Sequence, residues 1–169
     1  MTPAARVAAA IEILDMIGDG LPAEQVLTRW GRNNRFAGSK DRAAIRNYVY
    51  DVMRIKRTAA WLGRAGTGRG LMIGLLRAQG VAPSSLFIGE GHAPAPLMDY
   101  EEAVAAGEIP QEERWNLPDW LIQRFKEQLG EKAAETANAL ENRAPVTVRV
   151  NSLKTNTSKA LLMLEEAGV

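Results

Sequence analysis

Cysteine is absent from the 169-residue chain, and histidine occurs once, as His92. Without cysteine, no disulfide, thiolate metal site or thiol nucleophile can form. A single histidine also argues against a metal site built from histidines. Long apolar runs are lacking as well, because Arg6, Glu12 and Asp15 interrupt the apolar pattern of the amino terminus. This pattern fits neither a signal peptide nor a membrane span, so we expect a cytoplasmic protein. From the missing cysteine and the single histidine we also expect no bound metal.

The chain has almost no net charge, with 21 Lys and Arg residues against 20 Asp and Glu residues. The two halves differ: residues 1–80 contain 13 basic and 6 acidic residues, whereas residues 81–169 contain 8 and 14. The basic residues concentrate in one region, namely Arg29, Arg32, Arg35, Lys40, Arg42, Arg46, Arg54, Lys56, Arg57, Arg64, Arg69 and Arg77. Only Asp41 and Asp51 are acidic there. Such a basic patch attracts a phosphate backbone.

Apolar residues recur at helical spacing through the first 80 residues. The pattern predicts helices over 2–17, 22–30, 39–62 with a break near 54–57, and 71–79. The segment 32–38 is predicted to be a basic loop, and the glycine-rich run 63–70 a flexible connector. Four to five helices in this length indicate a compact all-α domain.

Proline and glycine interrupt the segment after Val81, which indicates a linking region with one candidate helix over 97–106. Two more helices are predicted over 118–129 and 132–142. Strict alternation over Val146–Asn151 then predicts a half-buried strand, and Thr157 or Ser158 should cap a last helix that ends at Gly168. An isolated strand cannot satisfy its edges. We therefore expect a fragment whose next strand lies beyond residue 169.

The basic helix and loop carry the strongest functional signal. On a helical wheel, Arg42, Arg46, Arg54 and Arg57 form a stripe away from the apolar face. Arginine and lysine hold phosphate independently of sequence, and arginine also stacks on bases. The predicted RNA-binding residues are Arg35, Lys40, Arg42, Arg46, Arg54 and Arg57. The alternative is a solvated helix face that has no partner.

Other candidate sites are weaker. The glycine run has no strand before it and no lysine-serine pair after it, so it does not match a phosphate-binding loop. Neighbouring carboxylates such as Glu112 and Glu113 point apart on a helix and are expected to be solvated. Trp115 and Trp120 are expected to pack their helix against a neighbour rather than to stack on RNA. No catalytic residue is predicted.

Three segments together resemble the RsmB/Sun/NOP family of RNA (cytosine-5) methyltransferases. They are Trp115-Asn-Leu-Pro-Asp-Trp-Leu-Ile-Gln-Arg-Phe, Arg143-Ala-Pro-Val-Thr-Val-Arg-Val-Asn-Ser-Leu-Lys and Leu161-Leu-Met-Leu-Glu-Glu-Ala-Gly-Val. Ser39-Lys-Asp-Arg, which opens the long predicted helix, is similar to the NusB-like helical domain of bacterial members. The resemblance implies a mainly α chain: a NusB-like RNA-binding bundle over 1–82, a helical linker over 83–117, and the start of a small α/β subdomain over 118–169.

The family's catalytic domain holds S-adenosylmethionine at a glycine-rich loop and attacks the cytosine ring with a cysteine. Methylation at C5 needs such a nucleophile, and this chain has no cysteine. We therefore expect the RNA-binding amino-terminal portion of a ribosomal RNA (cytosine-5) methyltransferase, inactive alone and without a cofactor of its own. Two alternatives remain: a NusB-like protein-interaction or antitermination adaptor whose basic stripe docks an acidic partner, and a structural cap that binds no RNA.

Overall fold

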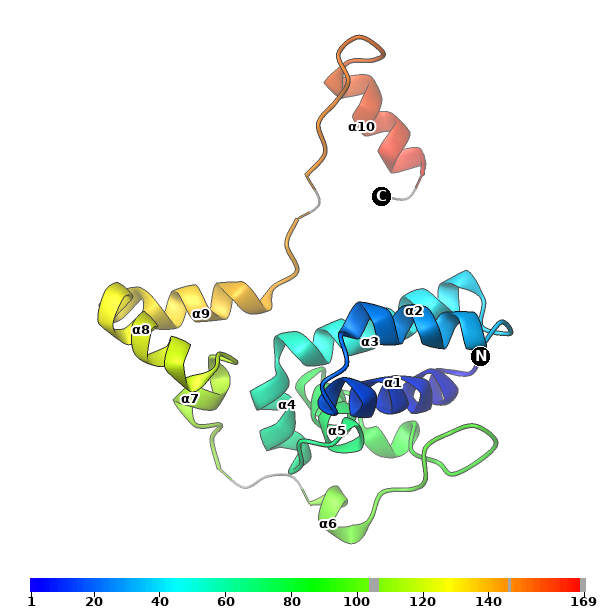
Figure 1. Cartoon of the computed structure of the whole chain (residues 1–169), viewed down its shortest axis with the longest axis vertical. Helices are drawn as coiled ribbons and strands as arrows, with labels where there is room; N and C mark the ends of the chain where they lie inside the picture. Colours follow the sequence, from blue (N-terminus) through cyan, green and yellow to red (C-terminus); the bar gives the residue numbers. More distant parts are fainter. Residues whose placement is uncertain (104–106, 146, 168–169) are drawn as a thin grey trace.

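The computed structural model describes residues 1–103, 107–145 and 147–167, which are mainly helical (Figure 1). The prediction of a mainly α chain is confirmed. The first half contains α1 (Pro3–Gly18), α2 (Ala23–Asn33), α3 (Ser39–Arg54), α4 (Lys56–Gly63) and α5 (Gly68–Ala78). The predicted break in the long helix is also confirmed, because Ile55 lies between α3 and α4 with a φ of −119°.

Side-chain caps fix the starts of two of these helices. The Thr2 hydroxyl accepts a hydrogen bond from the Ala5 amide (3.2 Å) at the start of α1. The Thr67 hydroxyl accepts one from the Gly70 amide (3.3 Å) at the start of α5. Each cap satisfies an amide that the helix leaves without an internal partner. Because Thr67 is the cap, α5 begins at Gly68, three residues before the predicted start at residue 71.

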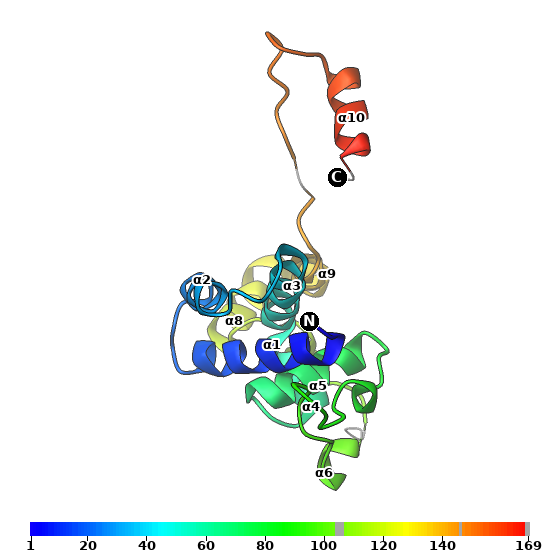
Figure 2. The same ribbon diagram turned by 90° about the vertical axis from the view of Figure 1, so that its right-hand side faces the viewer.

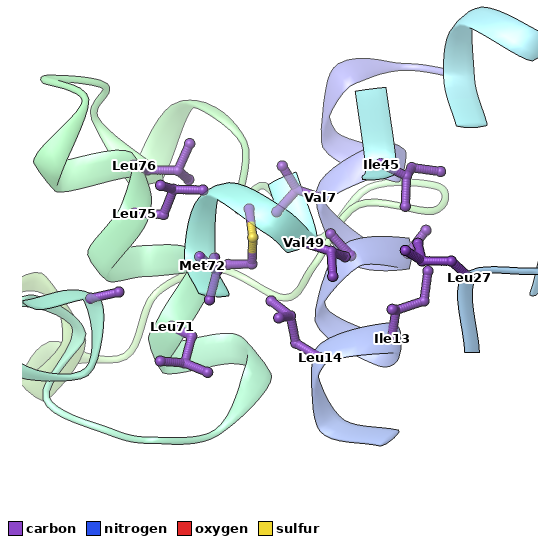
Figure 3. Packing of buried hydrophobic residues seen from close by; sticks show 14 of the residues in the cluster. Val7, Ile13, Leu14, Leu27, Ile45, Val49, Leu71, Met72, Leu75 and Leu76 are labelled. Carbon is purple, nitrogen blue, oxygen red and sulfur yellow. The ribbon is translucent and has the colours of Figure 1, made fainter. Parts of the chain in front are cut away.

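Helix α5 lies at the centre of the first half and packs against α1, α3 and α4 (Figure 2). All seven residues from Gly70 to Leu76 are buried, so this helix is apolar on every side. Figure 3 shows the cluster that it forms with α1, α2 and α3, in which the labelled side chains are Val7, Ile13, Leu14, Leu27, Ile45, Val49, Leu71, Met72, Leu75 and Leu76. Burial of this apolar surface is the main force that holds the helices together.

Glycines bring the backbones of α4 and α5 into direct contact. A Cβ atom on Gly74 would lie 1.8 Å from the Ala59 carbonyl oxygen, and one on Gly63 would lie 1.8 Å from the Gly70 carbonyl oxygen. The prediction of a flexible connector over 63–70 is therefore wrong for half of the run. Gly63 ends α4, and 68–70 form the first turn of α5, in which Gly68 and Gly70 are buried. The absence of side chains serves close packing here, not flexibility.

The second half consists of shorter helices joined by irregular segments. They are η1 (Pro83–Ser85), α6 (Asp99–Glu102), α7 (Gln111–Arg114), α8 (Asp119–Leu129), η2 (Gly130–Lys132), α9 (Ala133–Glu141) and α10 (Thr157–Glu166). Of the helix predicted over 97–106, only the four residues of α6 are helical, and 104–106 lie outside the described residues. Asn156 caps α10, where its side chain accepts a hydrogen bond from the Lys159 amide (2.9 Å), so neither predicted cap is used.

A small second core joins α8 and α9. Trp115, Ile122, Ala133 and Ala137 are buried in it, which confirms the packing role predicted for Trp115. The same prediction is wrong for Trp120, whose surface is 65% exposed. Trp120 precedes Ile122 by two positions, and at about 100° per residue the two side chains point to nearly opposite sides of α8.

The predicted strand is not formed in the part of the chain that the structure describes. Residues 147–151 are irregular, and Val146 lies outside that part. A strand requires a neighbour to complete its hydrogen-bond ladder, and no described segment pairs with this one. Figures 1 and 2 show this segment and α10 standing apart from the other helices, and α10 has no buried residue. The stop predicted at Gly168 lies outside the described residues.

Replacing Gly74 by alanine should destabilise the chain. Alanine favours a helix by about 1 kcal/mol relative to glycine, but overpacking typically costs about 1–3 kcal/mol. Here the added Cβ atom would meet the Ala59 carbonyl group, and backbone atoms move less readily than the end of a side chain. We expect a lower urea midpoint, followed by far-ultraviolet circular dichroism. Gly66→Ala is the matched control because a Cβ atom there meets nothing within 4 Å. Equal midpoints for the two variants would contradict the close contact.

Candidate nucleic-acid interface

A narrow groove of about 200 Å³ lies between α2 and α3. Its floor is apolar and includes the buried side chains of Leu27 and Ile45. Three arginines line it, Arg32 from the last turn of α2 and Arg42 and Arg46 from α3, and all three are exposed. The groove is therefore an apolar slot with a rim of guanidinium groups.

Arg42 is held in place above this groove by the backbone. Its Nε donates to the Ala37 carbonyl oxygen (2.8 Å), and its side chain passes over Gly31, where a Cβ atom would lie 3.8 Å away. Its two terminal nitrogens donate no hydrogen bond to any described residue. The bond from Nε thus orients the guanidinium of Arg42, and the N–H groups of its two terminal nitrogens remain available to a ligand.

Two carboxylates on α2 and α3, those of Asp41 and Glu24, are engaged elsewhere. Asp41 accepts from Arg6 Nε (2.8 Å) and from the amino-terminal ammonium (3.2 Å), and Arg6 first of all holds the Asp41 pKa below its ordinary value. Glu24 accepts from the Tyr50 hydroxyl (3.0 Å), which raises the pKa of that phenol. The positive charge of the groove is therefore not neutralised by these neighbours.

The predicted RNA-binding residues do not all meet at this groove. Arg42 and Arg46 lie on it, while Arg35 and Lys40 are exposed near the turn that joins α2 to α3. Arg54 forms an ion pair with Asp51 one turn earlier on α3. Arg32 was not among the predicted site residues, although it opens the predicted basic loop over 32–38. In the structure Arg32 lies in the last turn of α2, which continues to Asn33.

Arg57 binds the second half of the chain. Its Nε and Nη2 donate to the two carboxylate oxygens of Glu113 (2.9 and 3.0 Å). Its Nη1 donates to Asp119 Oδ1 (2.5 Å) and to the Leu117 carbonyl oxygen (3.0 Å). The carboxylates of Glu113 and then Asp119 raise the pKa of this guanidinium above its ordinary value. In this structure Arg57 therefore holds acidic side chains, and its predicted role in RNA binding stays a prediction.

Thr58 and Asn116 extend this contact. The Thr58 amide donates to Asn116 Oδ1 (2.9 Å), and Asn116 Nδ2 donates to the Thr58 hydroxyl (3.0 Å). The Thr58 hydroxyl also donates to the Glu113 carbonyl oxygen (3.1 Å). The amino-terminal turn of α4 thus holds residues 113–119 by side-chain and backbone bonds. We call Arg57, Thr58, Glu113, Asn116 and Asp119 the α4 clamp.

Comparison with known proteins matches one part of the chain. The family model described as "Methyltr_RsmF/B-like, ferredoxin-like domain" matches residues 117–169. The resemblance of this segment to RsmF/RsmB-like methyltransferases is thereby confirmed, while the NusB-like assignment of the first half stays a prediction. No curated protein matches the chain, and no solved structure matches it.

Within the part of the chain that the structure describes, no helix is both long enough and apolar enough to cross a membrane. Within 1–103, 107–145 and 147–167, no three His, Cys, Asp or Glu side chains are grouped so that they could hold a metal ion.

Removing the guanidinium of the α4 clamp should loosen residues 113–122. In Arg57→Gln, four hydrogen bonds to the second half are lost, and we expect faster amide exchange there and at Thr58. Hydrogen–deuterium exchange read by mass spectrometry measures this. Lys56→Gln is the control, because Lys56 is exposed and forms no ion pair with a described residue. Unchanged exchange in Arg57→Gln would show that the clamp does not hold the two halves together.

Proposed function

We propose that this chain is the RNA-binding portion of an S-adenosylmethionine-dependent ribosomal RNA (cytosine-5) methyltransferase that acts in the cytoplasm. One observation carries the RNA-binding part of the proposal: Arg32, Arg42 and Arg46 surround one groove and are exposed. The match of residues 117–169 to an RsmF/B-like methyltransferase domain supports the enzyme class. The nucleophile for methyl transfer must come from residues outside this cysteine-free chain.

The chemistry of the groove suits the phosphate backbone of RNA. Each arginine offers several donors in a planar fork that matches a phosphate, and it stays charged at any physiological pH. The bond from Arg42 to the Ala37 carbonyl orients that fork before RNA arrives, which lowers the entropy lost on binding. Phosphate contacts of this kind set the position of an RNA without reading its sequence. We therefore assign the groove to substrate positioning and not to choice of the target base.

The double variant Arg42→Gln/Arg46→Gln should bind a structured ribosomal RNA hairpin more weakly. Loss of two phosphate contacts lowers affinity by roughly ten- to a hundredfold near 0.1 M salt and reduces the slope of log K against log salt by about 1.5. Fluorescence anisotropy across a salt series measures both quantities. The single variant Arg46→Gln disturbs no hydrogen bond of the described chain, and about half of the slope change is expected from it.

The matched control is Arg124→Gln/Lys132→Gln, which removes the same charge from exposed positions on α8 and η2. We expect RNA affinity close to that of the unmodified chain. Equal losses of RNA affinity in the two double variants would show that net charge, and not the groove, determines RNA binding. Absence of RNA binding by the unmodified chain would favour the adaptor or the structural cap instead.

A further inference from the structure

A second and larger hollow, of about 710 Å³, also has Trp30 among its lining residues. It is formed by one face of α1, by the end of α2 with the turn that follows it, and by the loop before Ala93. We call it the α1 hollow. Its lining residues that matter below are Ala5, Ala8, Ala9, Glu12, Phe36 and Glu90.

Small side chains create the space. Ala5, Ala8 and Ala9 lie on one face of α1 and add only methyl groups to the wall of the hollow, while Glu12 adds a carboxylate one turn after Ala8. Trp30 is buried with 7% of its surface exposed and lines both the hollow and the α2–α3 groove. Phe36 also lines the hollow and is 73% exposed, an unusual position for a large apolar side chain. The wall of the hollow thus contains a patch of small apolar side chains and an exposed aromatic ring.

The charge of the hollow is opposite to that of the groove. Glu12 and Glu90 are exposed lining residues, and neither forms an ion pair with a described residue. No lysine or arginine lines the hollow. The amino-terminal ammonium of Met1 is close by, but it is paired with Asp41 at 3.2 Å. A ligand in the hollow therefore meets apolar surface, two carboxylates without an ion-pair partner among the described residues, and the polar side chains of Thr2, Asn34 and His92.

We propose that the α1 hollow binds a basic polypeptide segment, in which one or two aliphatic or aromatic side chains enter the hollow and flanking lysines or arginines meet Glu12 and Glu90. The volume lies within the range of about 300–1,000 Å³ that is typical of small-molecule pockets, so it has room for one or two such side chains. Opposite charges at the rim favour this partner, and the same carboxylates repel RNA phosphates. The site does not depend on the proposed RNA function, because the hollow and the groove share only Trp30 among their described lining residues.

The test uses the complete 169-residue chain and a defined probe, the peptide acetyl-Lys-Leu-Phe-Lys-Leu-Lys-amide carrying a fluorophore. We expect saturable binding, and at least tenfold weaker binding to Ala8→Leu, whose larger side chain fills the hollow. Glu12→Gln/Glu90→Gln should weaken binding by a similar factor. Glu131→Gln/Glu135→Gln removes the same charge from exposed positions in η2 and α9, and its affinity for the peptide should be unchanged.

Two further measurements separate this site from the RNA groove. Arg42→Gln/Arg46→Gln should bind the peptide as tightly as the unmodified chain, and Ala8→Leu should bind the RNA hairpin as tightly. Circular dichroism confirms that each variant is folded. The proposal is overturned if the peptide does not saturate, if Ala8→Leu binds it normally, or if Ala8→Leu loses RNA instead of peptide, since the hollow would then belong to an RNA site.

Discussion

The burial of α5 from Gly70 to Leu76 is the constraint on which the rest of the first half depends. A helix that is apolar on every side must be covered on every side, and α1, α3 and α4 provide that cover. The space between α4 and α5 admits no side chain at Gly63 or Gly74, so the two backbones touch. Because α4 is fixed in this way, its amino-terminal turn is also fixed, and that turn carries Arg57. The position of residues 113–119 then follows from the position of α5.

The arginines predicted to form one stripe on α3 and α4 therefore differ in their surroundings. Arg42 and Arg46 form no ion pair with a described carboxylate, since Asp41 is bound to Arg6, and both side chains are exposed beside the α2–α3 groove. Arg57 lies where the acidic second half returns, and Glu113 and Asp119 occupy its donors. The unequal charge of the two halves thus has two consequences. The basic and acidic halves form ion pairs at the α4 clamp. The arginines of the α2–α3 groove form no ion pair with a described residue, so their positive charge remains exposed.

Local patterns predicted the local structure well. Helical spacing located α1, α3 and α8, and the change of phase near residue 55 located the break before α4. The errors concern partners distant in sequence. Nothing near Gly74 indicates that Ala59 will press against it, and nothing near Arg57 indicates Glu113, which is 56 positions away. Trp120 was predicted to pack against a neighbouring helix, but its side chain is exposed. The segment 147–151 was predicted to be part of a strand, but no described segment pairs with it. Two of the six predicted site residues, Arg42 and Arg46, share a groove, because one turn of α3 separates them.

The most direct test of the account is to map where RNA contacts the chain. Amide chemical shifts recorded during titration with a structured ribosomal RNA hairpin report each backbone position separately. The account predicts that the largest changes occur in the last turns of α2, in the turn over 34–38 and in the first half of α3, with little change in α7, α8 and the α1 hollow. Changes concentrated in α8 to α10, or in the α1 hollow, would contradict it.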